Sequence, residues 1–292
     1  MNLPSRIPPD KSLLLERLVG SLSKIPHIRA VVLGGSYACG TQHNTSDLDV
    51  GLYYLEAKPF DIQAVRELAA QISRAGAQPT VTGFYEWGAW VNGGAWIQTA
   101  AGKLDFLYRN LDQVQRTIRE ARQGICRHDY DQQPAHGFYS VGYLAETQIC
   151  VPLYDPEGRI GELKKAVQHY PARLKQQIIS DSLWAAEFTL KHARGFAGQE
   201  DIYNTAGCLA RAAANLTQAL FAMNERYFLG DKKVMQTIAA FKILPKDHAN
   251  NTLSALAHPG ASRPELEGSV RKMETAWQAV AALAGAGYQP KF

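Results

Sequence analysis

The residue types that the chain uses change near residue 111, and this change limits the folds that it can adopt. Before that point, short runs rich in Val, Ile, Thr, Tyr, Phe and Trp alternate with helical patterns. Beyond it, long stretches of Ala, Leu, Gln, Lys and Arg contain few β-branched residues. The first group favours strands and the second favours helices. The sequence therefore predicts an α+β fold, in which a small mixed or antiparallel sheet with flanking helices precedes an all-helical C-terminal domain.

The individual elements follow from the apolar spacing and from the turn residues. Helices are expected at 10–23, 60–73, 111–123, 159–169, 172–195, 201–228, 231–242 and 263–284, and strands at 30–33, 48–55, 80–91, 95–99 and 103–108. Asn92-Gly93-Gly94 is typical of a hairpin turn. We expect a domain at 1–125 that carries the chemistry and a helical domain at 126–292 that closes over the substrate and the nucleotide.

The composition narrows the class of protein. Of the 292 residues, 46% are apolar and 20% are charged, as in ordinary folded proteins, which argues against a disordered or fibrous chain. Lys and Arg number 31 against 27 Asp and Glu, a net charge of +4. This surplus is too mild to indicate an extended nucleic-acid partner, but it suits a small phosphate-bearing ligand.

The same composition sets expectations about the cell compartment. The N-terminal sequence lacks the pattern of a secretory signal, and no run approaches the roughly 18 apolar residues that span a bilayer. The four cysteines are far apart and form no C-x-x-C pair, so neither a zinc site nor a disulfide framework is indicated. We therefore expect a cytoplasmic protein with no membrane partner.

The segment with the clearest chemical meaning joins the first two expected strands. Gly35 and Ser36 leave the first strand, and ten residues later Asp47 and Asp49 open the second. Glycines let backbone N–H groups approach a phosphate closely, and the serine adds a hydroxyl donor. Aspartates two positions apart on a strand point to the same face and can share hard cations. Asp105, a lone acid between apolar residues, completes this cluster if its strand pairs with the one that carries the aspartates.

This pattern resembles that of the DNA-polymerase-β-like nucleotidyltransferase superfamily: Gly-Ser, about ten residues, Asp-x-Asp, and a carboxylate on a later strand. The resemblance covers about residues 31–109. The stretches 86–96 and 224–228 also look like a bacterial branch of this superfamily that resembles antibiotic nucleotidyltransferases. The resemblance implies an enzyme of the nucleotidyltransferase class EC 2.7.7, but it does not name a substrate.

The resemblance also implies roles for individual residues. Gly35 and Ser36 would hold the β- and γ-phosphates of a nucleoside triphosphate, for which we expect ATP. Asp47 and Asp49 would bind two Mg²⁺ ions. Asp105 would ligate the catalytic metal and help to activate the acceptor hydroxyl. Paired metals suit this chemistry because they stabilise both the attacking and the leaving oxygen of an in-line displacement.

The identity of the general base is open at this point. Glu86, on the strand expected before the hairpin, is one candidate, and Glu146 is a more distant one. A solvated acid at a strand end is the plainer interpretation of Glu86. Three tryptophans near the hairpin, Trp87, Trp90 and Trp96, either cover the sheet or stack a nucleobase or a ring-bearing acceptor.

Basic residues on the expected helices are candidates to meet the triphosphate from the second domain, because a cleft between domains is a common ligand site. Foremost among them are Lys191 and Arg211, and the others are Arg194, Lys232 and Lys233. For any one of them, a position on a solvated helix face is the plainer interpretation.

The leading hypothesis is therefore Mg²⁺-dependent transfer of a nucleoside monophosphate to a hydroxyl of a small-molecule acceptor, with release of pyrophosphate. One alternative is nucleotidylation of RNA or of a protein target, as in a toxin. Another is a pseudo-enzyme that binds nucleotide for regulation, although that would be marked by loss of a carboxylate, and all three are present. The long helix expected at 201–228 packs either internally or in a homodimer.

Overall fold

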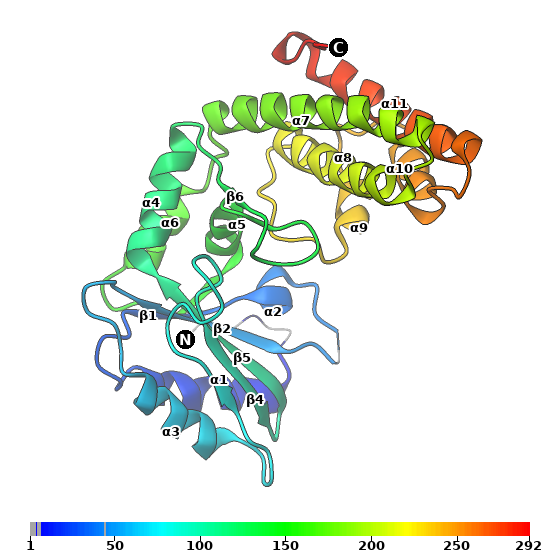
Figure 1. Ribbon diagram of the computed structural model, residues 1–292. Coiled ribbons are helices and arrows are strands. Elements are labelled where there is room, and N and C mark those ends of the chain that lie inside the picture. The colour runs from blue at the N-terminus through cyan, green and yellow to red at the C-terminus, as the bar shows by residue number, and fades with distance from the viewer. Residues whose placement is uncertain (1–3, 5–6, 44) are drawn as a thin grey trace. The chain divides into compact units, whose positions relative to one another are not determined.

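The structure is a computed structural model that describes residue 4, residues 7–43 and residues 45–292 (Figure 1). The chain divides into two compact units. Unit 1 comprises Met1–Arg119 and His128–His169, and unit 2 comprises Glu120–Arg127 and Tyr170–Phe292. In the described parts of the chain, no helix has both the length and the apolar character needed to cross a membrane.

Unit 1 is built on a six-stranded sheet with the order β3-β4-β5-β2-β1-β8. Its strands are β1 (Ala30–Leu33), β2 (Leu48–Tyr54), β3 (Thr80–Val81), β4 (Gly94–Thr99), β5 (Gly102–Asn110) and β8 (Val151–Tyr154). Strands β2 and β5 are parallel, and the other neighbours pair antiparallel. The sheet is therefore mixed, as the sequence predicts.

The two faces of this sheet differ in what covers them. Helices α1 (Pro9–Leu22) and α3 (Ile62–Ile72) lie against one face (Figure 1), where they bury alternate side chains of the central strands, among them Val50 and its register partner Phe106. Because side chains alternate along a strand, the intervening positions point to the opposite face. That face carries Asp49 on β2 and Asp105 on β5.

Residues 128–169 belong to unit 1 because they return to the sheet. After the short hairpin of β6 (His128–Asp129) and β7 (Phe138–Tyr139), they form α5 (Val141–Ile149), β8 and α6 (Arg159–Ala166). Strand β8 pairs with β1 and is the edge strand on this side of the sheet. The division into units therefore differs from a single boundary at residue 125, since the chain leaves unit 1 within α4 (Leu111–Arg122) and then re-enters it.

The prediction of one strand over residues 80–91 is wrong. Only the two residues of β3 are strand, and the chain then turns repeatedly up to β4. Tyr85 has φ 63° and Gly88 has φ 104°, conformations that a strand does not contain. The buried Asn92 side chain holds this loop, since it accepts a hydrogen bond from the Tyr85 N–H at 2.9 Å and donates one to the Tyr54 hydroxyl at 2.6 Å.

Unit 2 consists of helices: α7 (Ala172–Gly198), α8 (Ile202–Met223), α9 (Val234–Ala239), α10 (His248–Ala257), α11 (Arg263–Ala284) and the 3₁₀ turn Gly285–Gly287. Helices α7, α8 and α11 pack against one another, and α10 packs on α11. The helix expected at 201–228 ends at Met223, and Glu225 follows with φ 53°. The sequence predicts neither α10 nor, in unit 1, α5. From Tyr170 onward the regular elements are helical as expected, but the helical domain expected at 126–292 also contains β6, β7 and β8, so its first part is a correction.

An ion pair joins the sheet of unit 1 to α5. The Arg109 guanidinium, at the end of β5, donates to both oxygens of Glu146 at 2.7 and 2.8 Å. Only 7% of the Arg109 side chain is exposed, so its charge depends on this partner. Glu146 therefore has a structural partner, and its role as a general base stays a prediction.

We expect Glu146→Ala to lower the free energy of unfolding by about 3 kcal/mol, because it leaves the buried Arg109 charge without its partner. The control is Glu267→Ala, which removes the partner of Arg263, a side chain that is 60% exposed. That change is expected to cost about 0–1 kcal/mol. Urea unfolding of both variants checks this, and similar losses in the two would contradict the structural role of Glu146.

Candidate functional site

The turn after β1 lies directly beside β2. It forms the short helix α2 (Gly35–Cys39), and the Gly34 N–H donates to the Asp49 carbonyl at 2.8 Å. Gly35 has φ 57°, and a Cβ added there would lie 1.8 Å from Asp49 Oδ2. A side chain at position 35 is therefore excluded twice, by the backbone conformation and by the carboxylate that occupies its place.

The parallel pairing of β2 with β5 brings the predicted acids together. Asp49 and Asp105 are direct register partners, so their side chains lie next to each other on the face that α1 and α3 leave open. Asp47 precedes β2 by one residue. Lys103 Nζ joins it to the third acid, donating to Asp47 Oδ2 at 2.9 Å and to Asp105 Oδ2 at 3.1 Å. The fold thus gathers the three aspartates that the sequence predicts.

Lys103 is a member of the cluster that the sequence analysis missed. It lies two residues before Asp105 on β5 and therefore on the same face of the sheet. That period-two spacing is a signal that could have identified it. Hydrogen bonding to Asp47, with a smaller contribution from Asp105, raises the pKa of Lys103. Lys103 therefore stays positively charged and offsets part of the negative charge of the cluster.

Asp105 is more enclosed than Asp47. Its side chain is 15% exposed against 39% for Asp47, and its Oδ1 is buried without a hydrogen-bond partner. Burial raises the pKa of Asp105 above its ordinary value, and the charge of Asp47 raises it further, although Lys103 opposes both effects. A buried carboxylate oxygen without a partner is unfavourable, so this atom is suited to a cation or to a proton.

These donors fit the chemistry of a hard cation, but they are not arranged as a finished metal site. Among the described residues, no three His, Cys, Asp or Glu side chains are grouped closely enough to hold a metal ion. Lys103 lies between two of the carboxylates, and Asp49 Oδ2 points toward the position of Gly35. A metal at the unpartnered Asp105 Oδ1 would need these two side chains to rearrange.

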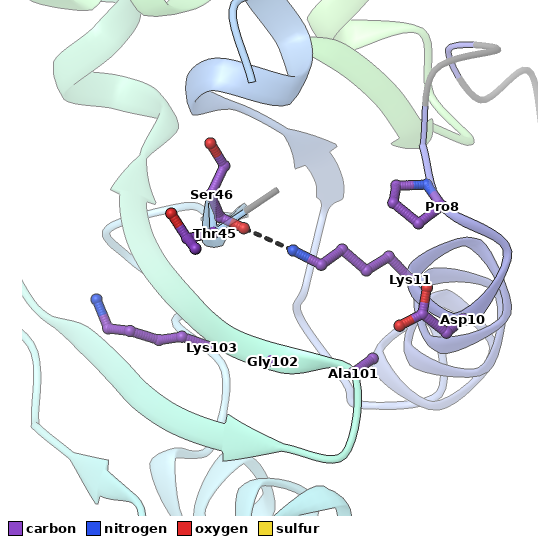
Figure 2. A pocket seen from close by; sticks show the side chains of 8 residues that line it. All are labelled: Pro8, Asp10, Lys11, Thr45, Ser46, Ala101, Gly102 and Lys103. Carbon is purple, nitrogen blue, oxygen red and sulfur yellow. Dashed lines mark hydrogen bonds between the residues drawn. The ribbon is translucent and has the colours of Figure 1, made fainter. Parts of the chain in front are cut away.

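A pocket of about 330 Å³ lies beside the cluster, at the start of β2 and β5 (Figure 2). It is lined by Pro8, Asp10, Lys11, Thr45, Ser46, Ala101, Gly102 and Lys103. The side chain of Lys11 reaches across it and donates to the Ser46 carbonyl at 2.6 Å, as Figure 2 shows. This contact anchors the residue that precedes Asp47, so it positions the first acid of the pair.

The other predicted site residues have contacts of their own or belong to the other unit. Glu86 closes a local turn, where its Oε1 accepts a hydrogen bond from the Gly83 N–H at 2.7 Å. Lys191 and Arg211 are in unit 2, where Lys191 Nζ lies 3.8 Å from the centre of the Phe292 ring. Roles for these two cations at the phosphates stay predictions, as does the role of Ser36, the second residue of α2.

The two glycines that bound α2 provide a matched test. Both have positive φ, 57° at Gly35 and 72° at Gly40, but the space around an added Cβ at Gly40 is open. Gly40→Ala should therefore cost only about 1 kcal/mol of unfolding free energy, the usual penalty of the left-handed conformation. Gly35→Ala should cost more and should also displace Asp49. Urea unfolding and calorimetric titration with a non-hydrolysable ATP analogue and Mg²⁺ measure both effects; equal behaviour of the two variants would contradict a special role for Gly35.

Two parts of the chain match models of known protein families. Residues 15–78 match the family model of the nucleotidyltransferase domain, and residues 140–232 match a domain of unknown function (DUF4037). Among solved structures, a nucleotidyltransferase-like protein from Exiguobacterium sibiricum 255-15 is similar with a TM-score of 0.46 and 8% identity, over 95% of this chain and 78% of that one. No curated protein matches. Residues 15–78, which contain the Gly-Ser turn and the Asp-x-Asp pair, thus match a nucleotidyltransferase domain, in agreement with the resemblance to the DNA-polymerase-β-like superfamily.

Proposed function

We propose that this protein is a Mg²⁺-dependent enzyme that transfers a nucleoside monophosphate from a nucleoside triphosphate, ATP in the first place, to a hydroxyl of a small-molecule acceptor. The observation that carries the proposal is the register of β2 and β5, which sets Asp49 beside Asp105 while the Asp49 carboxylate occupies the place of a side chain at Gly35. The glycine turn and the acidic pair are thereby contiguous.

In this reaction the acceptor oxygen forms a bond to the α-phosphorus, and the bond from that phosphorus to the oxygen bridging to the β-phosphate breaks. Pyrophosphate leaves with the electron pair of the broken bond. The hydroxyl proton passes to a base, for which Asp105 is suited because its raised pKa makes it a stronger proton acceptor than an ordinary aspartate. When bound, Mg²⁺ would stabilise the charge on the attacking and leaving oxygens.

The individual residues then have distinct tasks. The backbone N–H groups at Gly35 and the hydroxyl of Ser36 would hold the terminal phosphates, since glycine lets the backbone approach an anion closely. Asp47 and Asp49 would provide the oxygens that hold Mg²⁺ when it is bound. Lys103, which donates to Asp47 and Asp105, keeps these carboxylates in position. A small acceptor is favoured over a long polyanion because the excess of positive charge over the whole chain is only +4.

Asp47→Asn and Asp49→Asn should each abolish transfer while the fold remains intact, since each removes a metal ligand and relieves repulsion between carboxylates. Glu16→Gln, a change at an exposed position of α1, serves as the control and should retain activity. Mass spectrometry of acceptor panels incubated with each nucleoside triphosphate and Mg²⁺ detects the added nucleoside monophosphate. Near-normal turnover of either aspartate variant would contradict the assignment of Asp47 and Asp49 as metal ligands. Labelling of RNA or protein alone would favour the alternative acceptors.

A second pair of variants tests whether Asp105 or Glu86 is the general base. Asp105→Asn should reduce turnover by about 10²–10⁴-fold or more at every pH, because it removes a proton acceptor and a metal ligand together. Glu86→Gln should change turnover little, because its carboxylate closes a turn with Gly83. Turnover against pH and Mg²⁺ concentration measures both. A large loss in Glu86→Gln with normal Mg²⁺–nucleotide binding would instead identify Glu86 as the base.

A further inference from the structure

A pair of stacked tryptophans adjoins the acidic cluster. Trp96 on β4 is the direct register partner of Asp105 on β5, so the indole and the carboxylate lie on the same face of the sheet. Trp87 stacks on Trp96, with ring centres 4.8 Å apart and an angle of 22° between the planes. Even so, Trp96 is 48% exposed. We call these two rings the indole platform.

The surrounding chain makes room for this platform. A Cβ added at Gly94, two residues before Trp96, would lie 1.9 Å from the Phe106 carbonyl oxygen, so the close approach of β4 to β5 requires glycine there; the same Cβ would lie 3.0 Å from Trp87 Cζ3, so the Trp87 ring packs over this glycine. Trp90, by contrast, stacks on Phe138 at 5.3 Å and accepts a hydrogen bond from the Tyr143 hydroxyl at its carbonyl. Trp90 is therefore part of the packing of unit 1, whereas Trp96 leaves a broad apolar ring in solvent beside a charged site.

The indole platform lies on the side of the acidic cluster from which an acceptor would have to attack. Across the sheet, the Gly35 turn is next to β2, β2 is next to β5, and β5 is next to β4. The order is therefore glycine turn, Asp49, Asp105, Trp96. An in-line displacement needs the attacking oxygen on the side opposite the leaving pyrophosphate. Pyrophosphate at the Gly35 turn thus puts the acceptor hydroxyl on the β4 side, where the platform lies.

The residues around Trp96 indicate the chemistry of its ligand. On the same face of β4 its neighbours two positions away are Gly94 and Gln98, neither of them charged. Only the neighbours along β4 are uncharged; across on β5 the register partner of Trp96 is Asp105, whose charge is offset by Lys103. This setting suits a neutral planar ring better than a polycation, because aromatic rings stack favourably on one another in an offset arrangement. Of the acids nearby, Asp47 and Asp105 already have Lys103 as a partner.

We propose that the indole platform of Trp87 and Trp96 binds the acceptor, which is a neutral compound with a planar aromatic or heteroaromatic ring next to its hydroxyl. The ring stacks on Trp96 and holds the hydroxyl toward Asp105. This inference rests on the proposed nucleotidyl transfer and specifies the substrate class at that same site.

Two probes that differ only in the planarity of the ring test the proposal. Benzyl alcohol has a flat ring next to a hydroxyl, and cyclohexylmethanol is its saturated counterpart. Saturation-transfer NMR should show binding of benzyl alcohol at least about tenfold stronger than that of cyclohexylmethanol, the usual effect of aromatic stacking. Trp96→Ala should lose this preference and Trp96→Phe should largely keep it. Equal binding of the two probes, or unchanged binding to Trp96→Ala, overturns the proposal.

The matched control is Trp184→Ala. Trp184 is 46% exposed and stacks on Phe188 with ring centres 5.4 Å apart, so it is a comparably exposed stacked indole that belongs to unit 2, whereas the aspartates belong to unit 1. Its loss should leave benzyl alcohol binding unchanged. If Trp184→Ala and Trp96→Ala reduce the signal equally, the probe binds exposed tryptophans in general and the proposal fails. Circular dichroism and thermal unfolding verify that each variant is folded.

A second measurement separates acceptor from donor. Calorimetric titration with a non-hydrolysable ATP analogue and Mg²⁺ should give the same affinity for Trp96→Ala as for the unmodified protein. A loss of about tenfold would show that the platform stacks the base of the donor, which overturns the assignment to the acceptor. Failure of the proposed function has a different signature: normal transfer by Asp47→Asn and Asp49→Asn contradicts the metal chemistry, while selective aromatic binding at Trp96 is unaffected.

Discussion

The parallel pairing of β2 with β5 is the constraint on which the site depends. Parallel neighbours in direct register place side chains of equal position on the same face, and here the pair is Asp49 and Asp105. The chain between the two strands forms α3, β3 and β4, and it returns so that β5 lies between β2 and β4. Alternation then buries Val50 and Phe106 on the opposite face, so the packing of the core holds the acids in place.

The elements that the sequence predicts well are those with strong periodicity or strong boundaries. Strands β1, β2 and β5 and the long helices α7 and α11 lie close to their expected limits, because each buries an apolar run or stripe that has no equally good alternative. The three aspartates could be identified as a group for the same reason, since each lies in or beside such a strand. The candidate catalytic residues could thus be predicted where the strands that carry them could be predicted.

Other features depend on contacts that spacing does not reveal. The segment at 80–91 has the residue types of a strand, but Asn92 and the glycines hold it as a loop. Helix α5 and strand β8 are short, and their place is set by the sheet edge and by Arg109. The partner of Glu86, the Gly83 N–H, is a backbone group of the same turn. Such a tertiary or local partner decides whether an acid is available for chemistry, and the sequence alone does not show it.

Lys103 has a consequence for how such a site is assembled. A cluster of carboxylates normally resists folding, because each acid brought near another adds repulsion. Here the strand that delivers Asp105 also delivers an ammonium group two residues earlier, so the compensating charge arrives with the chain itself. The charge that balances Asp47 and Asp105 is therefore part of β5 itself and comes into place when β5 pairs with β2.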